Sequence, residues 1–182
     1  RDGTGHAVIP FKVNDTRAVA NAPHPVIEVA PDSFTTTMPR FATLSPDGAS
    51  VVFESLGRLY TKSAKGKDLP RPLTGDPENV LEAFPAFSRD GQSLAYVRWS
   101  DDKLGEIVLA DAQGQNRRVL VGPGHYGNLA FSPDGAMIAF EKREGGYLTS
   151  PDFSQDPGIY VMPVAGGEPR LVTRDGANPQ WG

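Results

Sequence analysis

The sequence predicts an all-β protein, a partial β-propeller of four-stranded antiparallel blades with three full repeats and partial blades at both ends. The corner Ser-(Pro/Arg)-Asp-Gly occurs three times, and its aspartates, Asp47, Asp90 and Asp134, stand 43 and 44 residues apart. An aromatic residue follows each aspartate by six positions, within an apolar run. No segment shows the three-and-four spacing of apolar residues that marks a helix. A period in the low forties with four short apolar runs is the length of one blade.

The first 39 residues are expected to hold the last strand of a preceding blade and a proline-rich connection. Residues 2–13 resemble a glycine turn followed by one strand, the order that also ends each later repeat. Residues 14–39 contain four prolines around a single apolar alternation. Proline cannot donate to a sheet ladder, so this stretch suits an extended connection with at most one strand.

The first full blade is expected over residues 40–82, and its corner explains how the chain reverses. Pro46 pre-sets the backbone for a turn, Asp47 can bond its own backbone, and Gly48 can take the left-handed conformation that closes a tight hairpin. Asp47 is therefore interpreted as a turn residue rather than a ligand. Strands are expected near residues 41–44, 50–54, 58–62 and 70–74.

Two further blades are expected over residues 83–127 and 128–176, the latter with an insertion at 143–157 between its second and third strands. Residues 177–182 begin another repeat, with Trp181 at its apolar position, and are expected to form the first strand of the next blade. Each blade buries its broad faces against its neighbours. We therefore expect further blades to complete a larger ring, with a small four-bladed ring or self-association through open blade edges as alternatives.

Composition narrows the classes of partner and chemistry. The formal net charge is −4 and the pI is about 5.4, whereas a general nucleic-acid or anionic-membrane binder is expected to carry a basic face. No apolar run approaches the roughly 20 residues needed to cross a bilayer, so membrane insertion is not expected. Cysteine is absent, which excludes disulfides, thiolate catalysis and zinc–thiolate sites. Arg1 is an implausible native start, and we expect a processed or excised segment.

The repeats resemble the WD40-like family of TolB and tricorn-type propellers, and the segment GIYVMPVAGGEPRLVT at residues 158–173 matches that pattern best. A narrower resemblance, to the amino-terminal propeller of exported bacterial amidohydrolase-family proteins, is carried by four segments. It implies export, to the periplasm or beyond, and an accessory module, because the metal ligands of that family lie in a later domain. The four segments are residues 6–11, 38–48, 56–60 and 96–102.

The search for catalytic motifs predicts that the chain is not an enzyme. His-x-His, HExxH and Gly-x-Ser-x-Gly are absent; the nearest approach, around Ser93, falls at a strand entry of the repeat. The three histidines, His6, His24 and His125, lie in separate segments rather than at ligand spacing, so neither a metal site nor a cofactor is expected. The basic run from Lys62 to Arg71 is interpreted as a solvated hairpin.

A candidate binding surface is expected where the repeats stop agreeing. The loops between second and third strands and those between blades emerge on one face of a propeller, and here they bring aromatic and charged residues together. The alternative is that Trp99 and Tyr126 cap the hydrophobic ends of the blades while the charges are solvated. The candidate residues are Arg98, Trp99, Asp101, Asp102, His125, Tyr126, Tyr147, Asp152 and Phe153.

The leading function hypothesis is a non-catalytic propeller segment of an exported multidomain protein. It would recognise or gate substrate for an amidohydrolase-type domain, or dock to that domain. Its partner would be another domain of the parent chain or a protein or peptide. One alternative is a TolB-like periplasmic propeller for protein–protein interaction, and another is the gating propeller of a serine peptidase.

Overall fold

The computed structural model describes residues 4–25, 29–77, 79–143 and 156–182, and the chain divides into two units, Arg1–Phe34 and Thr35–Gly182. The described residues of the first unit have no strand or helix, and nearly all are exposed to solvent. The strand expected within residues 2–13 is therefore not formed in its described part. A strand needs a neighbouring strand to pair its backbone N–H and C=O groups, and the described residues of this unit form no such pair.

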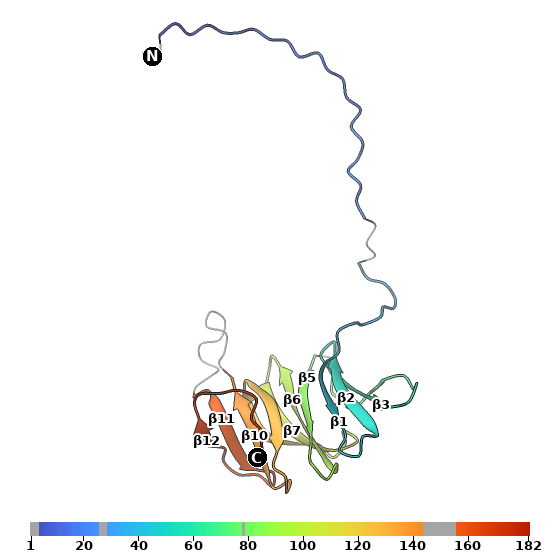
Figure 1. Ribbon diagram of the computed structural model, residues 1–182, viewed down its shortest axis with the longest axis vertical. Coiled ribbons are helices and arrows are strands. Elements are labelled where there is room, and N and C mark those ends of the chain that lie inside the picture. Colours follow the sequence, from blue (N-terminus) through green and yellow to red (C-terminus); the bar gives the residue numbers. More distant parts are fainter. Residues whose placement is uncertain (1–3, 26–28, 78, 144–155) are drawn as a thin grey trace. The chain divides into compact units, whose positions relative to one another are not determined.

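The second unit consists of three four-stranded sheets that stand side by side in chain order (Figure 1). Every strand pair is antiparallel, and each sheet keeps its strands in sequence order. This confirms the predicted all-β fold with three full four-stranded blades. The strands are β1 (Arg40–Leu44), β2 (Ser50–Ser55), β3 (Arg58–Ser63), β4 (Arg71–Pro72), β5 (Leu81–Phe87), β6 (Ser93–Ser100), β7 (Leu104–Asp111), β8 (Arg118–Gly124), β9 (Tyr126–Phe131), β10 (Met137–Lys142), β11 (Gly158–Pro163) and β12 (Arg170–Thr173).

The three corners are built alike from side-chain hydrogen bonds, as the second one shows. Ser88 Oγ donates to Asp90 Oδ1 at 2.6 Å, and the amide of Gln92 donates to the same oxygen at 3.0 Å. Ser88 Oγ in turn accepts from the amide of Ser93 at 2.9 Å. These donors stabilise the carboxylate and lower the pKa of Asp90, with equivalent contacts at the other two corners. The interpretation of these aspartates as turn residues agrees with this geometry.

The core lies between successive sheets. Side chains alternate along a strand, so β6 points Leu94 and Tyr96 toward the first sheet and Ala95 and Val97 toward the third. Tyr96 is fully buried in the first cluster, and Phe140 of β10 is 1% exposed in the second. The middle sheet thus packs on both of its faces, the arrangement expected of neighbouring propeller blades.

The first strands of the sheets share a bulge. Phe41, Phe84 and Asn128 have φ of 51°, 53° and 49°, and the pairing of each first strand shifts register near them. Asn178 repeats the feature with φ of 53°. The first strands β1, β5 and β9 lie next to one another as the inner strands of the unit, because β5 contacts both of the others.

Residues 177–182 do not form the strand expected there. Asn178 has the same positive φ as the bulge residues of the first strands, but residues 177–182 pair with no other strand among the described residues. Trp181 instead donates from Nε1 to the carbonyl oxygen of Ala130 on β9 at 3.0 Å. The division of both chain ends into neighbouring blades stays a prediction. In the part of the chain that the structure describes, no helix is long and apolar enough to cross a membrane.

Candidate recognition surface

The loops that join second to third strands and sheet to sheet emerge at one end of the sheets, which we call the loop face. The loop face includes residues 56–57, 73–77, 79–80, 101–103 and 125. The opposite end carries the Ser-(Pro/Arg)-Asp-Gly corners, because each corner precedes a second strand and each loop-face hairpin follows it. The predicted site residues that the structure describes lie on or next to the loop face.

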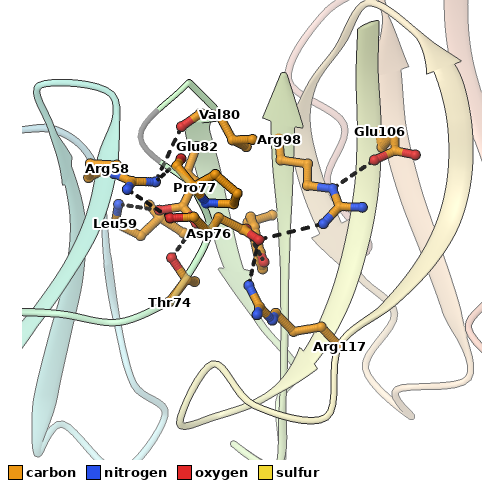
Figure 2. A network of polar contacts seen from close by, with 11 residues as sticks. Arg58, Leu59, Thr74, Asp76, Pro77, Val80, Glu82, Arg98, Glu106 and Arg117 are labelled. Carbon is orange, nitrogen blue, oxygen red and sulfur yellow. Dashed lines mark hydrogen bonds and ion pairs between the residues drawn. The ribbon is translucent and has the colours of Figure 1, made fainter. Parts of the chain in front are cut away.

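The connection from β4 to β5 is fixed by a buried carboxylate, Asp76 (Figure 2). Asp76 Oδ1 lies 2.6 Å from Nη1 of Arg117 and 3.6 Å from Nη1 of Arg98. Its Oδ2 accepts from the phenol of Tyr96 at 3.3 Å. Tyr96 and Arg98 lie on β6 and Arg117 lies just before β8, whereas Asp76 follows the last strand of the first sheet. This carboxylate therefore connects the two blades.

Glu82 forms a second connection between the same blades. Its side chain is 1% exposed, and its Oε2 accepts from the amide of Leu59 on β3 at 2.9 Å. The hydroxyl of Thr74 donates to Oε1, and the amide of Glu82 donates to the carbonyl oxygen of Gly57 at 2.8 Å. Burial raises the pKa of Glu82, and the nearby carboxylate of Asp76 raises it further.

Arginine side chains hold the loop that Asp76 begins. Arg58 donates through its guanidinium to the carbonyl oxygens of Asp76 at 2.8 Å and Pro77 at 2.9 Å, and Figure 2 shows it alongside this loop. Arg98, a predicted site residue, also pairs with Glu106 on β7 at 2.7 Å. The loop is therefore held from both blades before any ligand binds.

A small pocket of about 190 Å³ opens between this loop and the β6–β7 hairpin. Arg98 and Asp102, two of the predicted site residues, both line it. Carboxylate, cationic and apolar side chains all line the pocket, so it can hold a group that has both a polar and an apolar part. Its polar lining includes Asp76, Asn79, Arg98, Ser100, Asp102 and Glu106.

Trp99 and His125 form the aromatic part of the predicted surface. Their ring centroids are 4.8 Å apart, and the indole Nε1 of Trp99 donates to Asp101 Oδ1 at 3.1 Å. Gly105 permits the close approach of strands beneath Trp99: a Cβ there would lie 2.1 Å from the carbonyl oxygen of Gly124 and 3.3 Å from the indole. The structure thus brings Trp99, Asp101 and His125 together.

Tyr126 lies in the core rather than on the surface. It is 7% exposed, meets Phe140 edge-on at 5.6 Å, and donates from its hydroxyl to the carbonyl oxygen of Pro123 at 3.2 Å. Burial raises the pKa of its phenol. This position agrees with the alternative interpretation, in which Tyr126 caps the hydrophobic end of a blade. Tyr147, Asp152 and Phe153 lie outside the described residues.

Sequence reasoning missed a row of cationic and aromatic side chains that crosses the inner strands near the loop face. We call Arg40, Phe41, Phe84 and Arg143 the inner row. The Arg40 guanidinium lies 5.3 Å from the ring centroid of Phe41, that ring lies 4.1 Å from Phe84, and the Arg143 guanidinium lies 4.6 Å from Phe84. The repeat places Phe41 and Phe84 at equivalent positions, which is the one signal that the sequence offers.

An open groove of about 420 Å³ continues from the inner row along β1, β5 and β9. Most of its lining side chains are apolar and half-buried. They include Phe84, Phe87, Leu129 and Phe131, and the two phenylalanines of the inner row form its edge. The inner row is also linked to the ring pair of Trp99 and His125, because the amide of Arg143 donates to the carbonyl oxygen of His125 at 2.8 Å.

Among the described residues, no group of three or more His, Asp or Glu side chains is placed to hold a metal ion. The predicted absence of a metal or cofactor site therefore stays a prediction.

No protein-family model and no curated protein sequence matches the chain. Solved structures do, with probability 1.00. A putative TolB from Agrobacterium tumefaciens is 23% identical with a TM-score of 0.62, over 75% of this chain and 46% of that one. TolB from Acinetobacter baumannii is 22% identical with a TM-score of 0.53, over 71% and 33%. A puromycin-hydrolyzing peptidase from Mycobacterium tuberculosis is 22% identical with a TM-score of 0.52, over 72% and 22%.

These similarities show the fold: the sheets form a TolB-like propeller, as the repeat pattern predicts. The chain spans less than half the length of each of the three structures. What a complete parent protein does, and with which partner, is therefore a matter for proposal.

Proposed function

We propose that this chain is a non-catalytic recognition segment of a TolB-like propeller, which binds a protein or peptide partner through its loop face. The observation that carries the proposal is the construction of that face. Two buried carboxylates, Asp76 and Glu82, and the arginines around them fix the loop between the first two blades. Aromatic and charged side chains, Trp99 and Asp102 among them, then stand on a rigid scaffold.

The parent protein in this proposal is exported and multidomain, with an amidohydrolase-type domain to which the propeller docks or admits substrate. The support is the resemblance of residues 6–11, 38–48, 56–60 and 96–102 to the propellers of such proteins. Docking to a domain of the same chain and binding a separate protein both use an exposed recognition face, and they differ in whether contacts are intramolecular.

Two other functions have support of their own. A propeller for protein–protein interaction without an attached enzyme is favoured by the two TolB structures among the similar folds. A gating propeller of a serine peptidase is favoured by the puromycin-hydrolyzing peptidase. Both retain the loop face as the functional surface or the route of entry, so the first experiment concerns that face.

Site-specific photo-crosslinking tests the proposal. A photoreactive phenylalanine analogue replaces Asp102, an exposed residue of the β6–β7 hairpin, or Arg89, an exposed residue of the corner at the other end of β6. The protein is expressed in bacterial cells and illuminated. We expect a discrete crosslinked species from position 102 and none from position 89. An intramolecular product identifies domain docking, and an intermolecular one identifies a separate partner. Equal crosslinking from both positions, or none from 102, contradicts the proposal.

A further inference from the structure

The inner row presents positive charge to solvent over buried negative charge. The side chain of Arg40 is 59% exposed, whereas that of its partner Glu54 is 1% exposed, with 2.6 Å between Arg40 Nε and Glu54 Oε2. The side chain of Arg143 is 40% exposed and that of Glu141 is 17% exposed, with 3.4 Å between the closest atoms. In both pairs the guanidinium is the accessible member.

Other donors also engage the two carboxylates. Glu54 accepts from the amide of Gly57 at 2.6 Å, and Glu141 accepts from the side-chain amide of Asn128. The negative charge beneath the row is thus spread over several hydrogen bonds. A guanidinium carries five N–H donors, and the bond from Arg40 to Glu54 uses Nε. An incoming carboxylate can therefore bind the outer edge of Arg40 without displacing Glu54.

A glycine makes room for the second arginine. A Cβ at Gly127, on β9, would lie 2.6 to 2.9 Å from the guanidinium atoms of Arg143, too close for any larger residue unless the arginine moved. This space lets Arg143, which follows β10, reach across β9 to the ring of Phe84 on β5. The arginine thereby lies against Phe84, which lines the groove along the inner strands.

We infer that the inner row and its groove bind an extended acidic peptide segment, with carboxylates at Arg40 and Arg143 and an apolar side chain in the adjoining groove. This rests on the proposed function and adds the chemistry of the partner. Charge complementarity selects the acidic groups. Phe87 and Leu129, half-buried on the wall of the groove, provide apolar contacts for that side chain.

The same geometry disfavours an acidic oligosaccharide. Sugar rings stack on open aromatic faces, but a guanidinium lies against Phe41 and another against Phe84. A nucleic acid carries a charged phosphate at every nucleotide, whereas the inner row offers only two arginines. A peptide needs only the guanidinium edges and the groove, both of which are accessible.

Fluorescence anisotropy tests this inference with a labelled peptide, GEFELEG, and two control peptides. GKFKLKG reverses the charge and GESESEG removes the apolar side chains. We expect GEFELEG to bind. GKFKLKG should bind at least about tenfold more weakly because it loses charge-assisted hydrogen bonds. GESESEG should bind about tenfold more weakly because it loses the burial of apolar side chains. The peptide controls leave the protein unchanged, so they do not depend on the folding of any variant.

Protein variants locate the binding site. Arg40→Gln and Arg143→Gln should each weaken GEFELEG binding by about tenfold. The matched control Arg170→Gln, on the exposed outer strand β12, should not. Melting curves establish that each variant is folded. Binding of GKFKLKG equal to that of GEFELEG, or binding of a labelled acidic oligosaccharide when GEFELEG does not bind, overturns the inference.

The experiment separates this inference from the proposed function. If position 102 crosslinks a partner but GEFELEG does not bind, the loop face recognises a partner and the acidic-peptide chemistry is wrong. If GEFELEG binds and depends on Arg40 and Arg143 but position 102 gives no crosslink, the inner row is a peptide site and the proposed use of the wider loop face is wrong.

Discussion

The phenol of Tyr96 donates a hydrogen bond to the carboxylate of Asp76, 3.3 Å away, across the boundary between the first and second blades. Tyr96 is fully buried, and burial raises the pKa of its hydroxyl above the ordinary value of 10.0. A neutral phenol donating to a carboxylate satisfies both groups where water has little access. The boundary between blades is therefore specified by polar contacts as well as by apolar packing.

Removing this carboxylate should destabilise the protein. In Asp76→Ala the buried Tyr96 hydroxyl loses its acceptor and Arg117 loses its ion-pair partner. Breaking one side of a buried hydrogen-bonded pair costs about 3 kcal/mol. Chemical denaturation of the variant should show this loss in the free energy of unfolding. The matched control is Asp175→Ala at the equivalent, exposed position of the third repeat, with an expected change within about 0.5 kcal/mol. Equal losses in both variants would mean that the network contributes nothing specific.

Glu82 should make stability depend on pH in a direction opposite to that of the corner aspartates. Its folded-state pKa is raised above the ordinary value of 4.5, so the folded protein holds this proton more tightly than the unfolded chain. The stability that Glu82 contributes is fully present below 4.5 and is lost as the pH rises through the folded-state pKa.

A comparison of Glu82→Gln with the wild type isolates that dependence. Glutamine keeps a carbonyl oxygen for the amide of Leu59 and carries no titrating proton. The melting temperature of the variant minus that of the wild type should therefore become more positive as the pH rises from below 4.5 toward neutrality. A difference that stays constant, or that falls with pH, contradicts the assigned direction of the pKa shift.

Gly114 should tolerate no side chain, because the turn between β7 and β8 presses against the first blade. Its φ is +75°, and a Cβ would lie 2.5 Å from the carbonyl oxygen of Leu73. Gly135 is the matched control, with φ of +71° and no atom within 4 Å of its Cβ position. We expect Gly135→Ala to cost about 1 kcal/mol from backbone strain alone, and Gly114→Ala to cost at least about 2 kcal/mol. Equal unfolding free energies for the two variants would show that the backbone around Leu73 can move to accommodate a side chain at Gly114.

The repeat could be predicted because its signals are local. A corner needs Pro, Asp and Gly at adjacent positions, and each apolar run follows at a fixed spacing, so Asp47 and Phe53 identify a hairpin by themselves. The strand expected within residues 2–13 could not be judged in this way. Its apolar residues fit a strand, but a strand forms only beside a partner, and a local pattern does not specify one.

Only part of the candidate site could be predicted, again because the sequence shows local patterns but not contacts between distant segments. Trp99, Asp101 and His125 stand near one another because the connectivity of a propeller brings their loops to one end. Tyr126 resembles them in sequence, but the contacts that bury it come from Phe140 and Pro123, which no local pattern reveals. The inner row depends on Arg143 reaching Phe84 across an intervening strand, a contact between blades that only the folded chain defines.

The affinity of Trp99→Ala for the partner crosslinked from position 102 tests whether the loop face is the recognition surface. Truncating an aromatic anchor at a binding surface costs about tenfold or more in affinity. We expect that loss in Trp99→Ala, near-wild-type affinity in Trp99→Phe, and no change in Arg89→Ala at the opposite end of the blade. All three variants must melt as the wild type does. Unchanged affinity in Trp99→Ala, with the fold intact, would contradict the claim that the loop face is the recognition surface.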